Sequence, residues 1–251
     1  MNTIAKIGSR LLAACAAVMP CAGVAQTVIG SGCATFPAVF NQQQTVTINQ
    51  PVAAGKLIVV SVAVNALAQF TSVTDNAGNN YPITNAVILD ANSGIAAAYA
   101  GLVSSALNIG SIITINYFST GSTSAQSCAE AVMLPGIMAV ANPDDAYGTN
   151  VGNNSSLSVS SSAPTQFANE LVYSVFASAT TPGMIGAATP AQGLDLLCSG
   201  DNTLCVLPAW NLGATATGVE MAGAAAQNSV SWGALLITFR STDRLFANGF
   251  E

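Results

Sequence analysis

Residues 57–64 read LIVVSVAV, an almost unbroken apolar run. A strand with one buried face alternates apolar and polar side chains, whereas a strand covered on both faces is apolar nearly throughout. The run therefore predicts a central strand, in a fold whose β-sheets stack into two layers.

Alternating patterns lie on either side of this run. Val46 and Ile48 alternate with polar residues in TVTIN (45–49), and the same period of two recurs at 113–117 and 157–160, as in half-buried strands. Further strands are predicted at 95–100, 127–134, 170–177, 217–224 and 230–239. Clusters of Gly, Asn, Pro and Ser separate them, and no segment after residue 25 has a convincing amphipathic helical pattern. We predict a single all-β antiparallel sandwich of about ten to twelve strands.

The polar, turn-rich segment 142–156 is the candidate linker between two domains. Each half of the chain would then hold only about five strands, few for a sandwich of its own. We expect a long loop inside one domain instead. The predicted organisation is a signal peptide at 1–25, a β-sandwich domain at 26–241 and a tail at 242–251.

The first 25 residues have the layout of a secretory signal peptide. Lys6 and Arg10 precede an apolar stretch at 11–19, and the small residues 22–25 form a cleavage site. A membrane span needs about 20 apolar residues, and this stretch is far shorter. We therefore predict no transmembrane span and export to the extracellular space or cell surface, with the periplasm as the alternative.

Lipidation at Cys15 is the competing fate of this leader, because LAAC (12–15) matches the lipobox of bacterial lipoproteins. A lipobox follows an apolar core, however, and here only Leu11 separates it from Arg10. Plain secretion is favoured for that reason.

Charged residues make up 6% of the chain, against about 25% in an average soluble domain. After residue 25 three basic residues remain against eleven acidic ones, a formal net charge of −8. Such a chain has little to neutralise phosphates, so nucleic acid and anionic membrane surfaces are poor partners. The surface must consist mainly of hydroxyl, amide and small apolar groups.

Four cysteines follow the leader: Cys33, Cys128, Cys198 and Cys205. An even number in an exported chain predicts disulfides, and four cysteines allow three pairings. Cys198 and Cys205 bracket the turn-like SGDNTL, so we pair them, and Cys33 with Cys128 follows. Zinc is the alternative, but the cysteines lack close pairwise spacing and the chain has no histidine. No metal site is predicted.

Residues 74–81, TDNAGNNY, suggest either a calcium loop or a turn between two strands. An EF-hand loop beginning at Asp75 needs an oxygen ligand at its third position, glycine at its sixth and glutamate at its twelfth. The chain has Ala77, Asn80 and Ala86 there. We predict a turn in which Gly78 supplies a positive φ, and leave open an irregular site made of two carbonyl groups.

The absence of histidine removes the commonest general base and the Ser-His-Asp and Cys-His constellations. The chain also lacks a GxSxG motif and a phosphate-binding loop. We predict no catalytic residues, no cofactor and no enzyme activity.

Paired carboxylates are the chemistry that remains, because glycosidases use two of them. Glu130 and Glu220 lie in strand patterns with apolar neighbours and are the candidate pair. We favour the other interpretation, in which both point to the solvated face of a strand. Glu170 should begin a strand and accept backbone hydrogen bonds, and Asp144–Asp145 should form a loop turn.

The chain is sparse in aromatic residues, at 6%. Trp232 opens the last predicted strand and is expected to pack in the core. Trp210 follows Pro208 near the predicted disulfide clip and is the better candidate for stacking on a ligand, although core packing is the favoured interpretation there too.

Five blocks of the chain resemble a recurrent domain of bacterial secreted proteins, whose blocks read aGdLivv, vtDsaGNtY, lwYA, aNELv and WaavaisF. The matching blocks are AAGKLIVVSVAV (53–64), VTDNAGNNYPI (73–83), IAAAYAGL (95–102), ANELVYSV (168–175) and WGALLITFR (232–240). The resemblance implies a jelly-roll or concanavalin-like sandwich appended to surface or secreted proteins, with no assigned catalytic residues. Lys56 replaces the usual acidic residue, and the region around 198–205 departs from the pattern.

The last residues, DRLFANGFE (243–251), are similar to a terminal Phe-x-x-Gly-Phe-Glu signature of exported proteins in some gammaproteobacteria. The similarity implies handling during export or surface attachment. The alternative is that the two phenylalanines dock the chain end against the sandwich.

These observations favour a secreted, non-catalytic adhesion or ligand-binding module whose partner is a glycan or cell-surface polymer. The first alternative is a self-associating subunit of an extracellular fibre, in which segment 26–40 adds a strand to a neighbouring molecule. A carboxylate-based glycan hydrolase is the remote alternative. The three belong to different classes and predict different behaviour of the purified protein.

Overall fold

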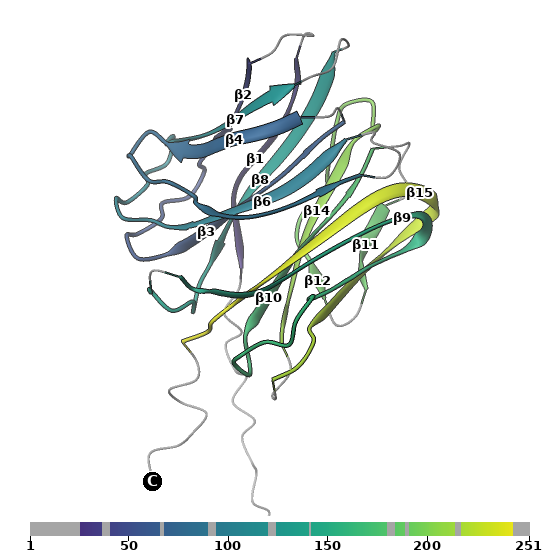
Figure 1. Ribbon diagram of the computed structural model, residues 1–251. Helices are drawn as coiled ribbons and strands as arrows, with labels where there is room; N and C mark the ends of the chain where they lie inside the picture. Colours follow the sequence, from purple (N-terminus) through teal and green to yellow (C-terminus); the bar gives the residue numbers. More distant parts are fainter. Residues whose placement is uncertain are drawn as a thin grey trace, which may run out of the picture.

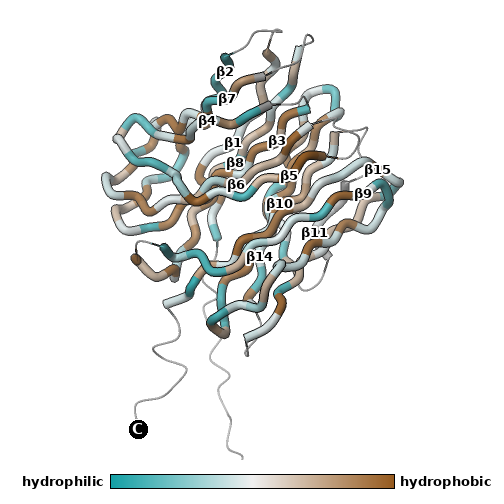
Figure 2. Tube along the Cα trace, in the orientation of Figure 1, coloured by the Kyte–Doolittle hydropathy of each residue, from teal (hydrophilic) through white to brown (hydrophobic). Residues whose placement is uncertain are grey.

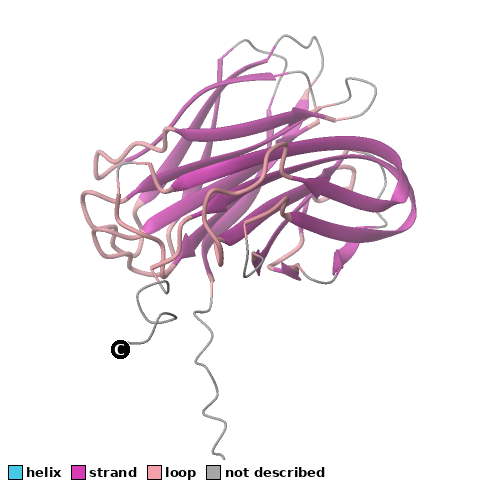
Figure 3. Cartoon of the chain, turned by 60° about the horizontal axis from the view of Figure 1, so that its bottom comes forward, coloured by secondary structure: helices cyan, strands magenta, loops and turns pink. Residues whose placement is uncertain are grey.

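The computed structural model describes residues 26–36, 41–65, 68–89, 94–119, 124–140, 142–179, 184–188, 191–213 and 217–242. This part of the chain contains strands and no helix (Figure 3). The strands are β1 (Thr27–Phe36), β2 (Asn41–Thr47), β3 (Leu57–Val64), β4 (Ala68–Asp75), β5 (Ile83–Ile88), β6 (Ile95–Leu102), β7 (Ile112–Ser119), β8 (Ala125–Leu134), β9 (Asp144–Ser160), β10 (Leu171–Ser178), β11 (Met184–Ala188), β12 (Gln192–Gly193), β13 (Leu197–Cys198), β14 (Cys205–Leu212) and β15 (Met221–Phe239). The predicted all-β sandwich is confirmed, with more strands than the ten to twelve expected.

The strands form three antiparallel sheets rather than two. The middle sheet has the order β1-β8-β3-β6-β5, and the small sheet β2-β7-β4 covers one of its faces (Figure 1). The large sheet follows the path β11-β15-β10-β14-β12, with β9 paired to β15 and β13 to β14, and covers the other face. The structure therefore has three stacked layers where two were predicted.

Strand β3 shows why the middle sheet has two covered faces. Leu57, Val59 and Ala63 pack toward the large sheet. The even-numbered residues of the strand, from 58 to 64, pack toward the small sheet. Every residue of the strand is buried, and the apolar stretches of β3 and β10 lie in the interior (Figure 2). The central strand predicted from LIVVSVAV is confirmed.

The alternating strands supply the outer walls of these cores. On β7, Ile113 and Ile115 are buried against the middle sheet while Thr114 and Asn116 turn outward. On β10, Tyr173 and Val175 face the middle sheet. Val172 and Phe176 face a third apolar cluster on the far side of the large sheet. Because successive side chains of a strand point to opposite faces, β10 contributes to a different core on each side.

Segment 142–156 is not the predicted loop. Strand β9 begins at Asp144 and pairs with β15 along most of its length. Residues 149–156 are almost all exposed, so no buried face imposed the alternation by which a strand is recognised in sequence. The two strands predicted at 217–224 and 230–239 are likewise joined in β15, across a register shift between Ala225 and Val230.

The N-terminal segment, considered above as a strand for a neighbouring molecule, pairs within its own chain. Strand β1 forms a ladder with β8 from Thr27 to Phe36. A Cβ atom added at Gly30 would lie 2.5 Å from the carbonyl oxygen of Thr47, so only glycine lets β1 pass this close to the end of β2.

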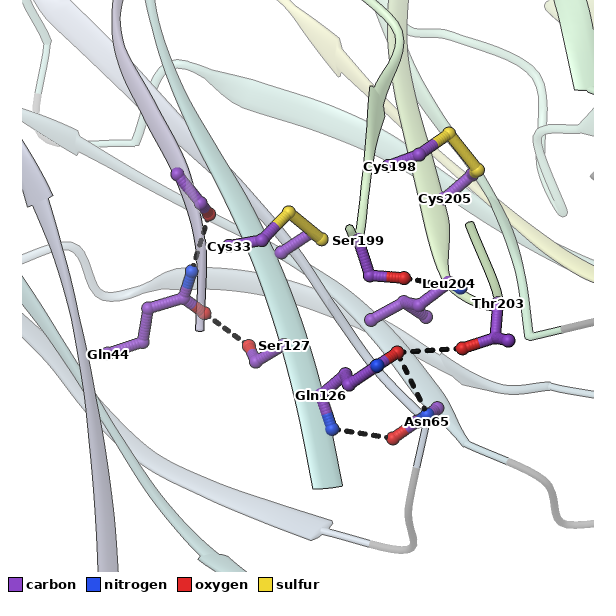
Figure 4. Close-up of a disulfide and its surroundings, with 12 residues drawn as sticks. Cys33, Gln44, Asn65, Gln126, Ser127, Cys198, Ser199, Thr203, Leu204 and Cys205 are labelled. Carbon is purple, nitrogen blue, oxygen red and sulfur yellow. Dashed lines mark hydrogen bonds between the residues drawn. A yellow bond between two sulfur atoms is a disulfide. The ribbon is translucent and has the colours of Figure 1, made fainter. Parts of the chain in front are cut away.

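Both predicted disulfides are present. Cys33 on β1 is bonded to Cys128, its direct partner on β8, and Cys198 on β13 is bonded to Cys205 on β14 (Figure 4). Disulfides persist in oxidising compartments and are rare in the cytosol. The two bonds therefore favour an extracellular or periplasmic location.

Strand β8 also joins all three sheets near these disulfides (Figure 4). The side chain of Gln44 on β2 accepts a hydrogen bond from the Ser127 hydroxyl. The neighbouring Gln126 accepts one from the Thr203 hydroxyl, at 2.7 Å, in the turn between β13 and β14. The small, middle and large sheets are therefore linked by polar contacts as well as by their cores.

None of the described residues belongs to a helix with the length and apolarity that a bilayer crossing demands. The predicted signal peptide at 1–25, the Cys15 lipidation alternative and most of the tail, 243–251, lie outside the described residues. They stay predictions.

The two disulfides should differ in their contribution to stability. The bonded cysteines are 95 residues apart in Cys33–Cys128 and 7 apart in Cys198–Cys205. Loop-closure entropy predicts losses of roughly 4–5 and 2–2.5 kcal/mol when each pair is replaced by serine. Urea unfolding of the two double variants should show the larger loss of stability for the variant without Cys33–Cys128. The reverse order would contradict the prediction that the bond closing the longer loop stabilises more.

Candidate functional site

The outer face of the small sheet carries a shallow groove with a volume of about 600 Å³. Its lining residues are neutral and almost all polar: Asn41, Gln42, Gln43, Thr71, Ser72, Asn116 and Tyr117. They come from β2, β4 and β7, three strands far apart in the sequence that lie together in Figure 1. The groove therefore offers hydrogen-bonding groups without a formal charge.

A row of side chains crosses the three strands inside this groove. Gln43, Asn116 and Ser72 are direct cross-strand neighbours. The Gln43 amide donates to Asn116 Oδ1 at 2.9 Å, and the Asn116 amide donates to Ser72 Oγ at 3.0 Å. An asparagine amide has two donors and two acceptor lone pairs. The row is thus held in place by its own bonds and still has capacity for a ligand.

A β-bulge in β4 shapes one wall of the groove. The register with β7 shifts between Phe70 and Ser72, which leaves Thr71 as the extra residue. Phe70 points into the core, and Thr71 and Ser72 are both exposed, where a regular strand would expose only one of two neighbours. Bulges of this kind re-aim side chains and are common beside functional sites.

Aromatic rings support the groove from below. Tyr117 forms edge-to-face pairs with Phe36 and Phe70, with ring centroids 5.6 and 5.9 Å apart, and Phe70 forms another with Tyr99 at 5.8 Å. Such pairs stabilise by about 0.5–1.5 kcal/mol beyond the burial of area. The floor is therefore packed and rigid.

The segment TDNAGNNY closes the end of β4 as a turn. Asp75 accepts four hydrogen bonds: from the backbone N–H groups of Ala77 and Asn79, from the Asn79 amide and from the Tyr81 hydroxyl. Gly78 has a φ of 88°, the left-handed region that glycine favours. The predicted turn is confirmed. Within the described residues, no group of three or more acidic, cysteine or histidine side chains could hold a metal ion.

Asn79 extends this turn to a second segment. Its Oδ1 atom accepts hydrogen bonds from the backbone N–H groups of Ser104 and Ser105, each at 2.8 Å, and its amide donates to the Ser105 carbonyl oxygen. Both Asp75 and Asn79 are buried. The carboxylate and the amide are therefore committed to structural bonds that hold the end of β4 beside the loop after β6.

Glu130 lies between the middle and large sheets, so the expectation of a solvated strand face is wrong. Its side chain is 0% exposed, because β8 belongs to the sheet that is covered on both sides. Its direct neighbours are Ser31 on β1 and Ser61 on β3, and the Ser61 hydroxyl bonds to the Tyr173 hydroxyl at 2.8 Å. Neither carboxyl oxygen has a hydrogen-bond partner among the described residues.

This surrounding changes the chemistry of Glu130. Burial, with a smaller contribution from the negative charge of Asp195, raises the pKa of Glu130 to about 8. A carboxyl group in such a place is protonated at neutral pH. It is a core acid without access to a substrate in solution.

Trp210 is half buried and belongs to the same interlayer region. It pairs with Tyr173 across β14 and β10 and packs against the core between the middle and large sheets. It does not line the groove on the small sheet. Trp232 is 2% exposed and packs in the third cluster, as predicted.

Glu220 lies just before β15 rather than within a strand. The side chain is 6% exposed and lies against Gly213, and its backbone bonds to Ser161 in both directions. Glu130 and Glu220 are therefore positioned by different elements. Neither of them lines the groove.

The remaining acids near β10 also differ from expectation. Glu170 precedes the strand, but its backbone carbonyl, rather than its carboxylate, accepts the bond from Gly213. Burial is the main reason why the pKa of Glu170 is raised to about 7. The Thr238 hydroxyl and the Arg240 charge oppose the rise, and nearby Asp145 adds to it. Asp144 and Asp145 begin β9 instead of forming a loop turn.

The sequence did contain a signal for the groove that we missed. Strand β2 alternates exposed and buried residues through NQQQTVT, and its outward residues are all amides or hydroxyls. The same holds for Thr114 and Asn116 on β7. Only the strand order, however, shows that these outward residues meet on one sheet.

The described structure defines an all-β, disulfide-bonded sandwich with three stacked sheets. Comparison with family models, with curated proteins and with solved structures gave no match. The resemblance to the bacterial secreted domain is confirmed only at the level of an all-β sandwich, and membership of that family stays a prediction.

Replacing Asn79 tests the structural role of the turn. Asn79→Ala removes the part-buried bonds to Ser104 and Ser105 and the buried bond from its amide to the Asp75 carboxylate, so unfolding should cost on the order of 2–4 kcal/mol less. The exposed neighbour Asn80 is the matched control and should change stability little when replaced by alanine. Calcium should leave the melting temperature unchanged in both variants and in the wild type. Calcium stabilisation lost in Asn79→Ala would instead indicate a cation site.

Glu130 should make stability depend on pH. Its carboxyl loses a proton near pH 4.5 when unfolded and near pH 8 when folded, so unfolding releases a proton between these values. The free energy of unfolding should fall by about 1.4 kcal/mol for each pH unit in that window.

Glu130→Gln should remove the slope contributed by Glu130, which extends to about pH 8. Glu170→Gln should remove only the contribution of Glu170, which ends near pH 7, and leave the slope between pH 7 and 8 in place. Urea unfolding at several pH values between the two pKa values measures the effect. Equal slopes in the wild type and in Glu130→Gln would show that the carboxyl is ionised in the core.

Proposed function

We propose that this protein is a secreted, non-catalytic ligand-binding or adhesion module, and that the groove on its small sheet binds an uncharged glycan or a similar surface polymer. The observation that carries the proposal is the lining of the groove. It combines a bonded row of amide and hydroxyl groups with a tyrosine, and no charged side chain is among its lining residues.

The chemistry of the row fits a hydroxyl-rich, neutral ligand. Sugar hydroxyls both donate and accept hydrogen bonds, and amide side chains do the same. The mutual bonds of Gln43, Asn116 and Ser72 fix their orientation before binding, which lowers the entropy cost of association. An anionic polymer would meet the formal −8 charge of the chain after residue 25 and be repelled.

The positions of the acids support a non-catalytic role. Glycosidases place two carboxyl groups on either side of the scissile bond. Glu130 is enclosed between two sheets and Glu220 lies near Gly213, so neither reaches a ligand in the groove. The chain also has no histidine to serve as a general base.

Asn116→Ala should abolish or strongly weaken binding, because it removes both bonds of the row and its free donor and acceptor. A panel of immobilised neutral polysaccharides, with anionic ones for comparison, provides the measurement. We expect retention on at least one neutral polymer and a loss of about tenfold or more in affinity for the variant. Thr114→Ala, on the same face of β7 but outside the groove, is the matched control and should bind as the wild type does.

Other outcomes would favour the alternatives. Filaments or a concentration-dependent size, without polysaccharide binding, would indicate a self-associating fibre subunit. Release of sugar products that is lost in Glu130→Gln or Glu220→Gln would indicate a hydrolase. Wild-type affinity in Asn116→Ala would move the binding site away from the small sheet.

A further inference from the structure

A second depression lies on the other side of β4. Its volume is about 230 Å³, and it is bounded by β4, by the segment after the Asp75 turn and by the face of β5 and β6 that is turned toward the small sheet. The residues that it adds to the wall of β4 are Asn80, Tyr81, Pro82, Thr84 and Tyr99. It shares Thr71 and Ser72 with the groove on the small sheet.

The shared residues are those of the β-bulge. Because the bulge exposes Thr71 and Ser72 together, both residues line both depressions, and the Ser72 hydroxyl accepts a hydrogen bond from the Asn116 amide. The Thr71 hydroxyl also donates to the backbone carbonyl of Asn116 at 3.1 Å, which ties the crossing point to the row in the groove. Thr71 and Ser72 therefore form a polar boundary that the two depressions share.

The same aromatic rings run beneath both depressions. Tyr117 lines the groove, Tyr99 lines the second depression, and Phe70 contacts both rings from below the bulge. One continuous packed floor thus supports the whole path. A ligand that rests on one depression would find the other already formed.

The two depressions differ in what they offer. The groove presents the amide row, whereas the second depression presents the exposed Asn80, Pro82 and Thr84. Tyr81 is 2% exposed and its hydroxyl donates to Asp75, so this residue supports the depression from below and offers no free donor. No charged side chain is among the lining residues of either depression.

We infer that the two depressions form one binding path for an extended neutral oligosaccharide, which crosses β4 at Thr71 and Ser72. Its first sugars bond to the amide row, and its later sugars pack on the Pro82 ring and bond to the side chains of Asn80 and Thr84. Apolar ring faces bind the C–H surfaces of sugars, while hydroxyl and amide groups bind their edges. The inference rests on the proposed function and adds that the protein selects oligosaccharides by their length.

The test uses the secreted full-length product and the oligosaccharide series of whichever neutral polysaccharide binds, from disaccharide to hexasaccharide, by isothermal titration calorimetry. Affinity should rise with chain length until the ligand spans both depressions. Thr84→Trp fills the second depression and should weaken hexasaccharide binding by about tenfold or more while leaving disaccharide binding unchanged. Ala86→Trp places the same side chain further along the exposed face of β5 and should change neither.

The outcomes separate the inference from the proposed function. Binding that is lost in Asn116→Ala, independent of chain length and unaffected by Thr84→Trp would overturn the continuous path and keep the groove. Equal effects of Thr84→Trp and Ala86→Trp would also overturn it. Failure of every neutral oligosaccharide and polysaccharide to bind would remove the proposed function and the inference together.

Discussion

Both faces of the middle sheet are apolar, and the chain can fold only if both of them are covered. Strand β3 is buried from end to end, and burial of apolar surface is the main favourable contribution to folding. The large sheet covers one face and the small sheet the other. A three-stranded sheet has little stability without a packed face. The small sheet is therefore stabilised by packing on the middle sheet, and its other face carries the groove.

The same double coverage explains the chemistry of the buried acids. A carboxyl group on β8 that faces the large sheet has no solvent to stabilise its charge, and its raised pKa follows from that position. In a cleft, a perturbed acid is a candidate for catalysis. Here the perturbed acid and the solvent-exposed groove lie on opposite sides of the middle sheet, because Glu130 faces the large sheet and the groove is on the outer face of the small one.

Local patterns determined how much of the molecule could be predicted. The apolar run of β3, the Asp75 turn and the cysteine pairs each carry their information within the residues concerned, and each is confirmed. Of strand β9, the alternating end at 157–160 was predicted, and the part before it was missed because residues 149–156 are almost all exposed and show no alternation. The third layer and the groove were missed because they depend on which strands are neighbours. Strands β2, β4 and β7 form one sheet, although the strands between them in the sequence, β3, β5 and β6, belong to another.

The disulfides join consecutive cysteines of the chain after residue 25, Cys33 to Cys128 and Cys198 to Cys205. A chain that enters an oxidising compartment amino end first would present Cys128 to the waiting Cys33 before either later thiol arrives. The native bridges are then also those favoured by order of emergence, out of three possible sets. Such a polypeptide would have little need of an isomerase to correct mispaired thiols.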